Sequence, residues 1–131
     1  MTTPDYLQPR ECNYQQLSPL TFLERSAWIH RNKAAVVHGD QCFTYPELFE
    51  RSRRLASALA GLGIGYGDTV SAMLPNVPPL LEAHFGIPAL GAVLNALNIR
   101  LDASTIAHIL DHGGTKVLIT DTEFAPIIKE A

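Results

Sequence analysis

The sequence predicts an α/β fold with a mainly parallel sheet flanked by helices, and an antiparallel hairpin near the N-terminus. Short apolar runs of strand type alternate with helical patterns after residue 68, which is typical of parallel strands joined by crossover helices. Two further strand-type runs flank a Gly-Asp pair, as in a hairpin. At 131 residues, with 47% hydrophobic and 18% charged residues, the chain has the size and composition of one ordered domain.

The N-terminal residues 1–18 are polar and contain Pro4 and Pro9, so we expect an extended arm there. Residues 19–131 are expected to form a partial α/β domain. A helical pattern begins at Pro19. Its expected apolar face contains Leu20, Leu23, Ala27 and Trp28.

The hairpin is predicted from the runs at residues 34–38 and 42–45, with Gly39-Asp40 between them. Glycine at the first turn position supplies the positive φ of a type II′ turn. A helix then follows, because Thr44 and Glu47 have the spacing of a capping box and Pro46 suits a first turn.

The apolar stripe of this second helix should bury four leucines, while Arg51 and Arg54 face water. The four are Leu48, Leu55, Leu59 and Leu62. Four alternate glycines, from Gly61 to Gly67, come next. They do not form the GxGxxG pattern of a nucleotide-binding turn, because Asp68 takes the place of the third glycine and the stretch follows a helix. We interpret them as a helix stop and connector.

The second half of the chain contains three predicted parallel strands, at residues 69–74, 93–97 and 116–120. A helix beginning at Pro78-Pro79 is expected to run through Leu81, Phe85 and Leu90, and Pro88 should kink it or end it early.

Two further helices are expected to have aspartate caps. Asp102 would cap a helix whose apolar stripe is Ala103, Ile106, Ala107 and Leu110. Asp121 would cap a short last helix with Phe124, Ile127 and Ile128 facing inward. Since no strand follows that helix, we expect the architecture to be the incomplete N-terminal part of a larger domain.

Composition argues against two classes of partner. The net charge is −3, and the densest basic cluster (Arg51, Arg53 and Arg54) fits a solvated helix face better than a nucleic-acid site. The apolar segment 77–97 contains Glu82 and three prolines, which disfavours a membrane span.

No secretory signal is visible at the N-terminus, and Cys12 and Cys42 lack metal or redox spacing. We therefore expect free thiols and a cytoplasmic protein.

Four residues could carry chemistry, and each has a structural alternative. His108 and His112 have a metal-binding i, i+4 spacing, yet polar-face and helix-dipole roles explain both. His84 could line an acyl pocket or be a hydrogen-bonded core or rim histidine. Arg100 could bind a carboxylate or phosphate, pair with an acid, or cap a helix. The sequence has no serine elbow and no Walker loop.

Two stretches resemble the core motifs of AMP-forming adenylating enzymes. FTYPEL (residues 43–48) is similar to the first motif, and HFGIPALGAVLNALNIRLD (residues 84–102) is similar to the second, in the form seen in acyl-CoA synthetases. The residues between them, and KVLITD (residues 116–121), fit the family's strand and helix pattern. The resemblance covers residues 17–131.

The resemblance implies the N-terminal segment of an enzyme that activates a fatty, medium-chain or aromatic carboxylic acid. ATP would give an acyl-adenylate, and coenzyme A would then give the thioester. The family's phosphate loop, its Mg²⁺ and ribose ligands and its catalytic lysine lie beyond the matched region. We therefore predict no catalytic, cofactor-binding or metal residue in this chain, and no adenylation by the chain alone. ATP, Mg²⁺, coenzyme A and the acid would be partners of the full enzyme.

Two alternatives remain at this point. The chain could be a stand-alone, non-catalytic module that works by self-association through open sheet edges, forming a homo-oligomer. It could also be a small binding domain of unrelated function.

Overall fold

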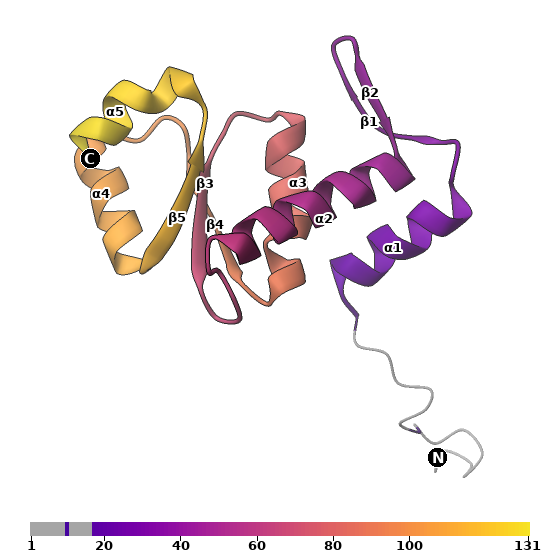
Figure 1. Ribbon diagram of the computed structural model, residues 1–131. Coiled ribbons are helices and arrows are strands. Elements are labelled where there is room, and N and C mark those ends of the chain that lie inside the picture. Colours follow the sequence, from indigo (N-terminus) through magenta and orange to yellow (C-terminus); the bar gives the residue numbers. More distant parts are fainter. Residues whose placement is uncertain (1–9, 11–16) are drawn as a thin grey trace, which may run out of the picture.

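The computed structural model describes residue 10 and residues 17–131, so the predicted N-terminal arm lies mostly outside the described residues. The described elements form two sheets. A three-stranded sheet has the order β4-β3-β5, and a separate hairpin pairs β1 with β2 (Figure 1). β3 (Thr69–Met73) pairs in parallel with β4 (Val93–Ala96) and with β5 (Thr115–Thr120). The predicted α/β class and the hairpin are both confirmed.

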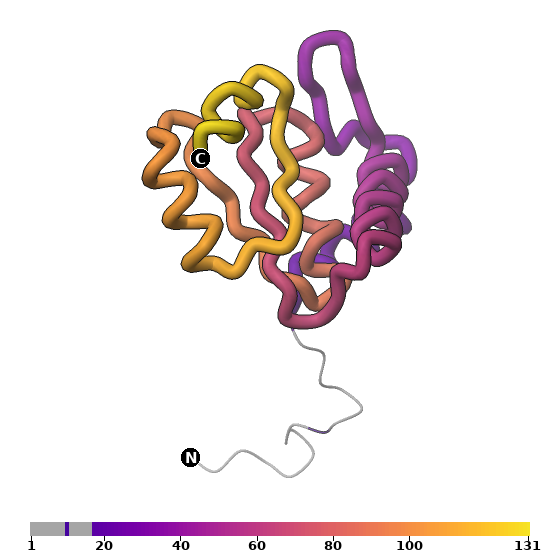
Figure 2. Tube along the Cα trace, turned by 60° about the vertical axis from the view of Figure 1, so that its left-hand side comes forward, coloured from indigo at the N-terminus to yellow at the C-terminus, as the bar shows by residue number. Residues whose placement is uncertain are grey.

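Helices cover both faces of the parallel sheet (Figure 2). Val70 and Ala72 point toward α2 (Tyr45–Gly61) and α3 (Pro78–Gly86). Met73 points the other way, toward α4 (Ala103–His112) and α5 (Ala125–Glu130). All three side chains are fully buried, because alternate residues of a central strand face opposite layers.

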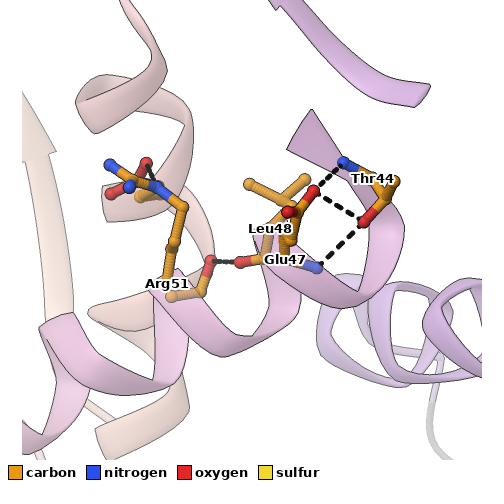
Figure 3. A network of polar contacts seen from close by, with 6 residues as sticks. Thr44, Glu47, Leu48 and Arg51 are labelled. Carbon is orange, nitrogen blue, oxygen red and sulfur yellow. Dashed lines mark hydrogen bonds and ion pairs between the residues drawn. The ribbon is translucent and has the colours of Figure 1, made fainter. Parts of the chain in front are cut away.

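The hairpin joins β1 (Ala34–His38) to β2 (Gln41–Thr44), with Gly39 at φ +57° in the turn. α2 follows directly and begins with the predicted capping box: the Thr44 N–H donates to Glu47 Oε2 at 2.7 Å, and the Glu47 N–H donates to Thr44 Oγ1 (Figure 3). These bonds from Thr44 hold the pKa of Glu47 below its usual value.

Two helical predictions need correction. α1 (Pro19–Ile29) buries Leu23 and Ala27 as expected, but Trp28 is 69% exposed, since the helix packs against α2 on one side only. The Arg31 guanidinium lies over the Trp28 ring. Leu62 is also 69% exposed, because it caps the end of α2 and no longer follows the helical period.

Pro88 ends α3 early, as predicted: the helix stops at Gly86, and a 3-10 turn, η3 (Pro88–Leu90), follows it. Gly86 allows α2 and α3 to approach closely, because a Cβ at this position would lie 2.8 Å from the Ser52 carbonyl oxygen. Any side chain here would push the two helices apart.

β4 is parallel, as predicted, but Val93 is 52% exposed because β4 is an outer strand of the described sheet. Asp102 caps α4 as expected. Asp121 caps a 3-10 turn, η4 (Thr122–Phe124), and α5 begins after it. In residues 17–131, no helix is both long enough and apolar enough to cross a membrane.

The glycine-rich stretch is a connector anchored by Asp68. Asp68 accepts a bond from the Gly65 N–H at 2.9 Å and pairs with Lys116 Nζ at 2.6 Å. Lys116 and then the Gly65 N–H hold the pKa of the Asp68 carboxyl below its usual value. The Asp68 carboxylate therefore connects the loop before β3 to the start of β5.

A buried polar chain crosses the parallel sheet. Asn95 Nδ2 donates to Ser71 Oγ at 2.9 Å, and Ser71 Oγ lies 2.7 Å from Thr115 Oγ1. Ser71 is fully buried. Because Ser71 accepts from Asn95, its own hydroxyl proton is available for Thr115. One side-chain relay thus links all three strands.

Replacing Asp68 with asparagine should reduce the pH dependence of the free energy of unfolding at acidic pH. The folded pKa of Asp68 is lowered, so its ionised form stabilises the fold above the unfolded pKa near 4, and this contribution is lost as the pH falls through the folded pKa. In urea unfolding, Asp68→Asn should be less stable than wild type at about pH 7, and the difference should shrink at about pH 3. Asp40→Asn, at the exposed hairpin turn, is the control. A pH-independent difference would contradict the assignment.

Replacing Asn95 with alanine should destabilise the chain by about 1–3 kcal/mol, because Ser71 loses its donor in a buried place. Asn98→Ala, which removes an exposed turn bond to the Arg100 N–H, should change stability by no more than about 0.5 kcal/mol. Chemical denaturation of both variants measures the contrast. Equal destabilisation by the two substitutions would mean that the buried Asn95–Ser71 bond stabilises the fold no more than the exposed turn bond.

Candidate functional site

A groove of about 520 Å³ lies between the hairpin and α3, and it is here called the hairpin groove. β1 supplies one wall and the first turns of α3 supply the other. Most of the lining is apolar, and three polar side chains interrupt it. The apolar lining is Pro19, Val36, Val37, Val77, Pro78, Leu80, Leu81 and Phe85, and the polar lining is His38, Asn76 and His84.

His84 lies on the rim of this groove. Its ring Nδ1 is 2.8 Å from the Leu80 carbonyl oxygen, which can only accept, so Nδ1 carries a proton. The ring itself is exposed. The structure therefore gives His84 the hydrogen-bonded rim position that was one of its two expected roles. Its role in an acyl pocket stays a prediction.

The start of α3 does not present free amide donors to the groove. Pro78 and Pro79 have no N–H, and the Leu80 N–H already donates to the Val77 carbonyl at 3.0 Å. Anion binding at a helix N-terminus needs such donors. The groove is therefore suited to apolar groups and to neutral hydrogen-bonding groups.

A second groove of about 510 Å³ adjoins the first, and α1, α2 and α3 line it. The two grooves share Pro19, Leu81 and Phe85. Leu17 and Phe22 enlarge this surface and are 83% and 52% exposed. Together the grooves form one apolar trough on the side of the molecule away from α4 and α5.

The carboxyl ends of the parallel strands carry Asn98, Arg100 and Asp102. Ligands in open α/β sheets bind at such ends. Asp102, however, accepts from the Ser104 hydroxyl at 2.6 Å and from the Thr105 N–H at 3.0 Å. These bonds, led by that from Ser104, hold the pKa of Asp102 far below its usual range, so it caps the helix and does not act as a base at neutral pH.

Arg100 is exposed, and its backbone N–H donates to Asn98 Oδ1 at 2.9 Å. Its guanidinium takes part in none of the ion pairs found within residues 17–131. Neither the expected acid partner nor a helix cap is therefore present in the described part. Its binding of a carboxylate or phosphate stays a prediction.

The structure brings His108 and His112 together on the outside of α4. Their rings stack with centroids 5.7 Å apart, and both are exposed. Across residue 10 and residues 17–131, no three histidine, cysteine, aspartate or glutamate side chains gather as a metal site. Cys42 is an exposed free thiol, and Cys12 lies outside the described residues.

One predicted solvent-facing residue is in fact paired. Arg51 Nε lies 2.6 Å from Glu82 Oε1, and the Glu82 side chain is only 10% exposed (Figure 3). The solvated-face expectation holds for Arg54, which pairs with Glu50 at 76% exposure, but it is wrong for Arg51. A lone acid in the apolar segment of α3 was the sequence signal for this pair, since buried carboxylates need partners. No comparable feature of the sequence indicates the contact between Ser71 and Thr115.

These side chains hold elements together, and none of the described contacts forms a nucleophile–base pair. The glycine stretch lies at the amino ends of the strands, and its aspartate is engaged by Lys116. Asp68 is therefore a structural carboxylate that anchors the glycine stretch.

The comparisons with known proteins agree with the motif resemblance. The family described as AMP-binding enzyme matches residues 23–131. A peroxisomal acetate/butyrate–CoA ligase of Arabidopsis thaliana is 45% identical over 127 residues, which cover 97% of this chain and 22% of that protein. The chain thus spans about a fifth of the length of the curated relatives it matches.

Solved structures share the fold. An anthranilate CoA ligase in complex with anthranoyl-AMP superposes with a TM-score of 0.81 and 29% identity, covering 84% of this chain and 21% of the other. A Mycobacterium tuberculosis fatty acyl CoA synthetase superposes with a TM-score of 0.81 and 32% sequence identity. The match covers 83% of this chain and 22% of the other. The sequence match, the shared fold and the two core motifs lead to one conclusion: this chain belongs to the AMP-binding enzyme family.

Proposed function

We propose that this chain is a segment of an ATP-dependent, AMP-forming acid–CoA ligase, which converts a carboxylic acid to its acyl-CoA thioester through an acyl-adenylate. The observation that carries the proposal is the 45% identity to an acetate/butyrate–CoA ligase over 97% of the chain. Residues 23–131 also match the AMP-binding family. The remainder of such a ligase would be the principal partner of this segment.

The substrate class in this proposal is a small carboxylic acid. The relatives are named for acetate and butyrate, for anthranilate and for fatty acyl groups. This range supports an acid with an aliphatic or aromatic body. A role in fatty acid metabolism belongs to the same proposal.

The segment's own contribution is to build and brace the larger domain. Its polar side chains are used in caps, ion pairs and the strand relay, and its glycine stretch is an anchored connector. We therefore propose that ATP, Mg²⁺ and coenzyme A bind residues outside this segment. Phosphoryl chemistry depends on positioned donors and a metal, and the polar side chains named above are already engaged in structural bonds.

The compartment is also a proposal. The cytoplasmic location expected from the sequence is one candidate, and a peroxisomal location is the other, since the related ligase from Arabidopsis thaliana is named as peroxisomal. Imaging of the tagged protein with a peroxisomal marker distinguishes the two locations.

A second candidate function is self-association without catalysis. The outer strand β4 exposes Val93, and the trough exposes Leu17 and Phe22, so two copies could pair at these surfaces. This candidate requires that a 131-residue product exists in the source organism.

The purified 131-residue chain should give no ATP–pyrophosphate exchange with acetate, butyrate or anthranilate. The longer gene product, where one is expressed, should exchange with at least one of these acids and form its CoA thioester. Intact-mass measurement of the native protein identifies which product exists. Exchange by the short chain would contradict the structural role, and a longer product that forms no acyl-CoA from any carboxylic acid would contradict the ligase proposal.

Self-association predicts a mass that increases with concentration. Light scattering of the 131-residue chain should show dimers if the exposed edge and trough pair, and Val93→Lys should return the chain to monomers. Thr69 and the rest of the central strand stay unchanged in this variant, so circular dichroism provides the folding control. A monomer at all concentrations would exclude the second candidate.

A further inference from the structure

The hairpin stands apart from the rest of the molecule. β1 pairs only with β2 in the described structure (Figure 1). Val37, near the turn, is 71% exposed. A two-stranded hairpin is marginally stable by itself. Its position over the hairpin groove must therefore be set by contacts at its base.

The backbone contact at the base closes the hairpin but does not fix its tilt. The Tyr45 N–H donates to the Lys33 carbonyl at 3.3 Å, which joins the two ends of the hairpin where α2 begins. This bond and the Thr44–Glu47 capping box both lie at the junction of β2 and α2, so neither supports the hairpin beyond its base. A side-chain contact farther along α2 is needed to set the angle.

Arg51 makes that contact. Its guanidinium carbon lies 4.5 Å from the centre of the Phe43 ring in β2, while its Nε lies 2.6 Å from Glu82 Oε1 in α3. A planar guanidinium can stack its face on a ring and donate from its edge at the same time. One side chain of α2 thus connects the hairpin to α3.

The two contacts are unequal. Glu82 is buried in an apolar helix, so its carboxylate requires a charged partner and holds Arg51 in place. Phe43 then rests on a guanidinium whose orientation is already fixed. Glu82 therefore fixes the orientation of the Arg51 side chain, and Arg51 in turn fixes the position of the hairpin.

We propose that Arg51 is the positioning residue of the hairpin: held by Glu82 and stacked on Phe43, it sets the angle at which β1 walls the hairpin groove. Val36, Val37 and His38 reach the groove through this placement, opposite Leu80 and His84. Without the stack of Phe43 on Arg51, the hairpin pivots at its base and the groove loses a wall, while the buried parallel sheet keeps its packing. The inference does not depend on the ligase assignment.

Two measurements on the 131-residue chain test the proposal. In Arg51→Leu, amide hydrogen exchange in residues 34–44 should accelerate by about tenfold more than in residues 69–73, as expected for loss of a stacking contact and the ion pair that orients it. A nitroxide on Cys42, in a Cys12→Ser background, should give a sharper spectrum. Arg54→Leu removes the neighbouring exposed pair with Glu50 and is the matched control, which should change neither readout.

A second variant keeps the test decisive if Arg51→Leu does not fold. Phe43→Leu leaves the Arg51–Glu82 pair intact and removes only the stack, so it should free the nitroxide at Cys42 without accelerating exchange in residues 69–73. An unchanged nitroxide spectrum in the folded variant would overturn the proposal. Equal acceleration in the hairpin and in β3 would overturn it as well, because Arg51 would then be a general stabilising residue.

Discussion

The complete burial of β3 is the constraint on which the rest of the structure depends. Val70, Ser71, Ala72 and Met73 are fully buried, and both edges of the strand are paired. A strand enclosed in this way needs a helical layer on each face and a parallel neighbour on each side. α2 and α3 supply one layer, and α4 and α5 supply the other. The order β4-β3-β5 follows, because the chain must cross first one face and then the other.

Polar side chains then fix the register of this enclosed strand. At its amino end, Asp68 joins the loop to Lys116 of β5. Within the sheet, Ser71 joins Asn95 on one side to Thr115 on the other. Apolar packing fixes which side chains of a strand face each layer, and a buried donor that must meet its acceptor adds a second constraint on the register. The Asp68–Lys116 pair and the Asn95–Ser71–Thr115 contacts thus favour one register of β3 relative to β4 and β5.

Features that act over a few residues could be predicted from the sequence. The Thr44–Glu47 box, the stop at Pro88 and the Asp102 cap were all identified, since each interaction spans four residues or fewer. Arg51 and Glu82 are 31 residues apart, so the lone acid in an apolar helix indicates that a partner is needed but not which residue it is. Ser71 and Thr115 are 44 residues apart, and no local pattern predicts their contact. Trp28 was misplaced for the same reason: periodicity shows which residues share a face, and only tertiary packing shows how much of that face is covered. The grooves were missed because they arise between elements.

The most family-specific stretch, residues 84–102, also shows why a signature need not mark a catalytic site. Pro88 ends a helix, Asn95 donates into the strand relay, and Asp102 caps α4 with its pKa far below the usual range. Each of these polar or unusual residues has a structural task that an apolar residue could not perform. A segment that runs from the end of α3 to the capped start of α4 therefore needs these residue types to keep its path. The resemblance consequently identifies the architecture directly, and it identifies the chemistry only through the longer proteins that share that architecture.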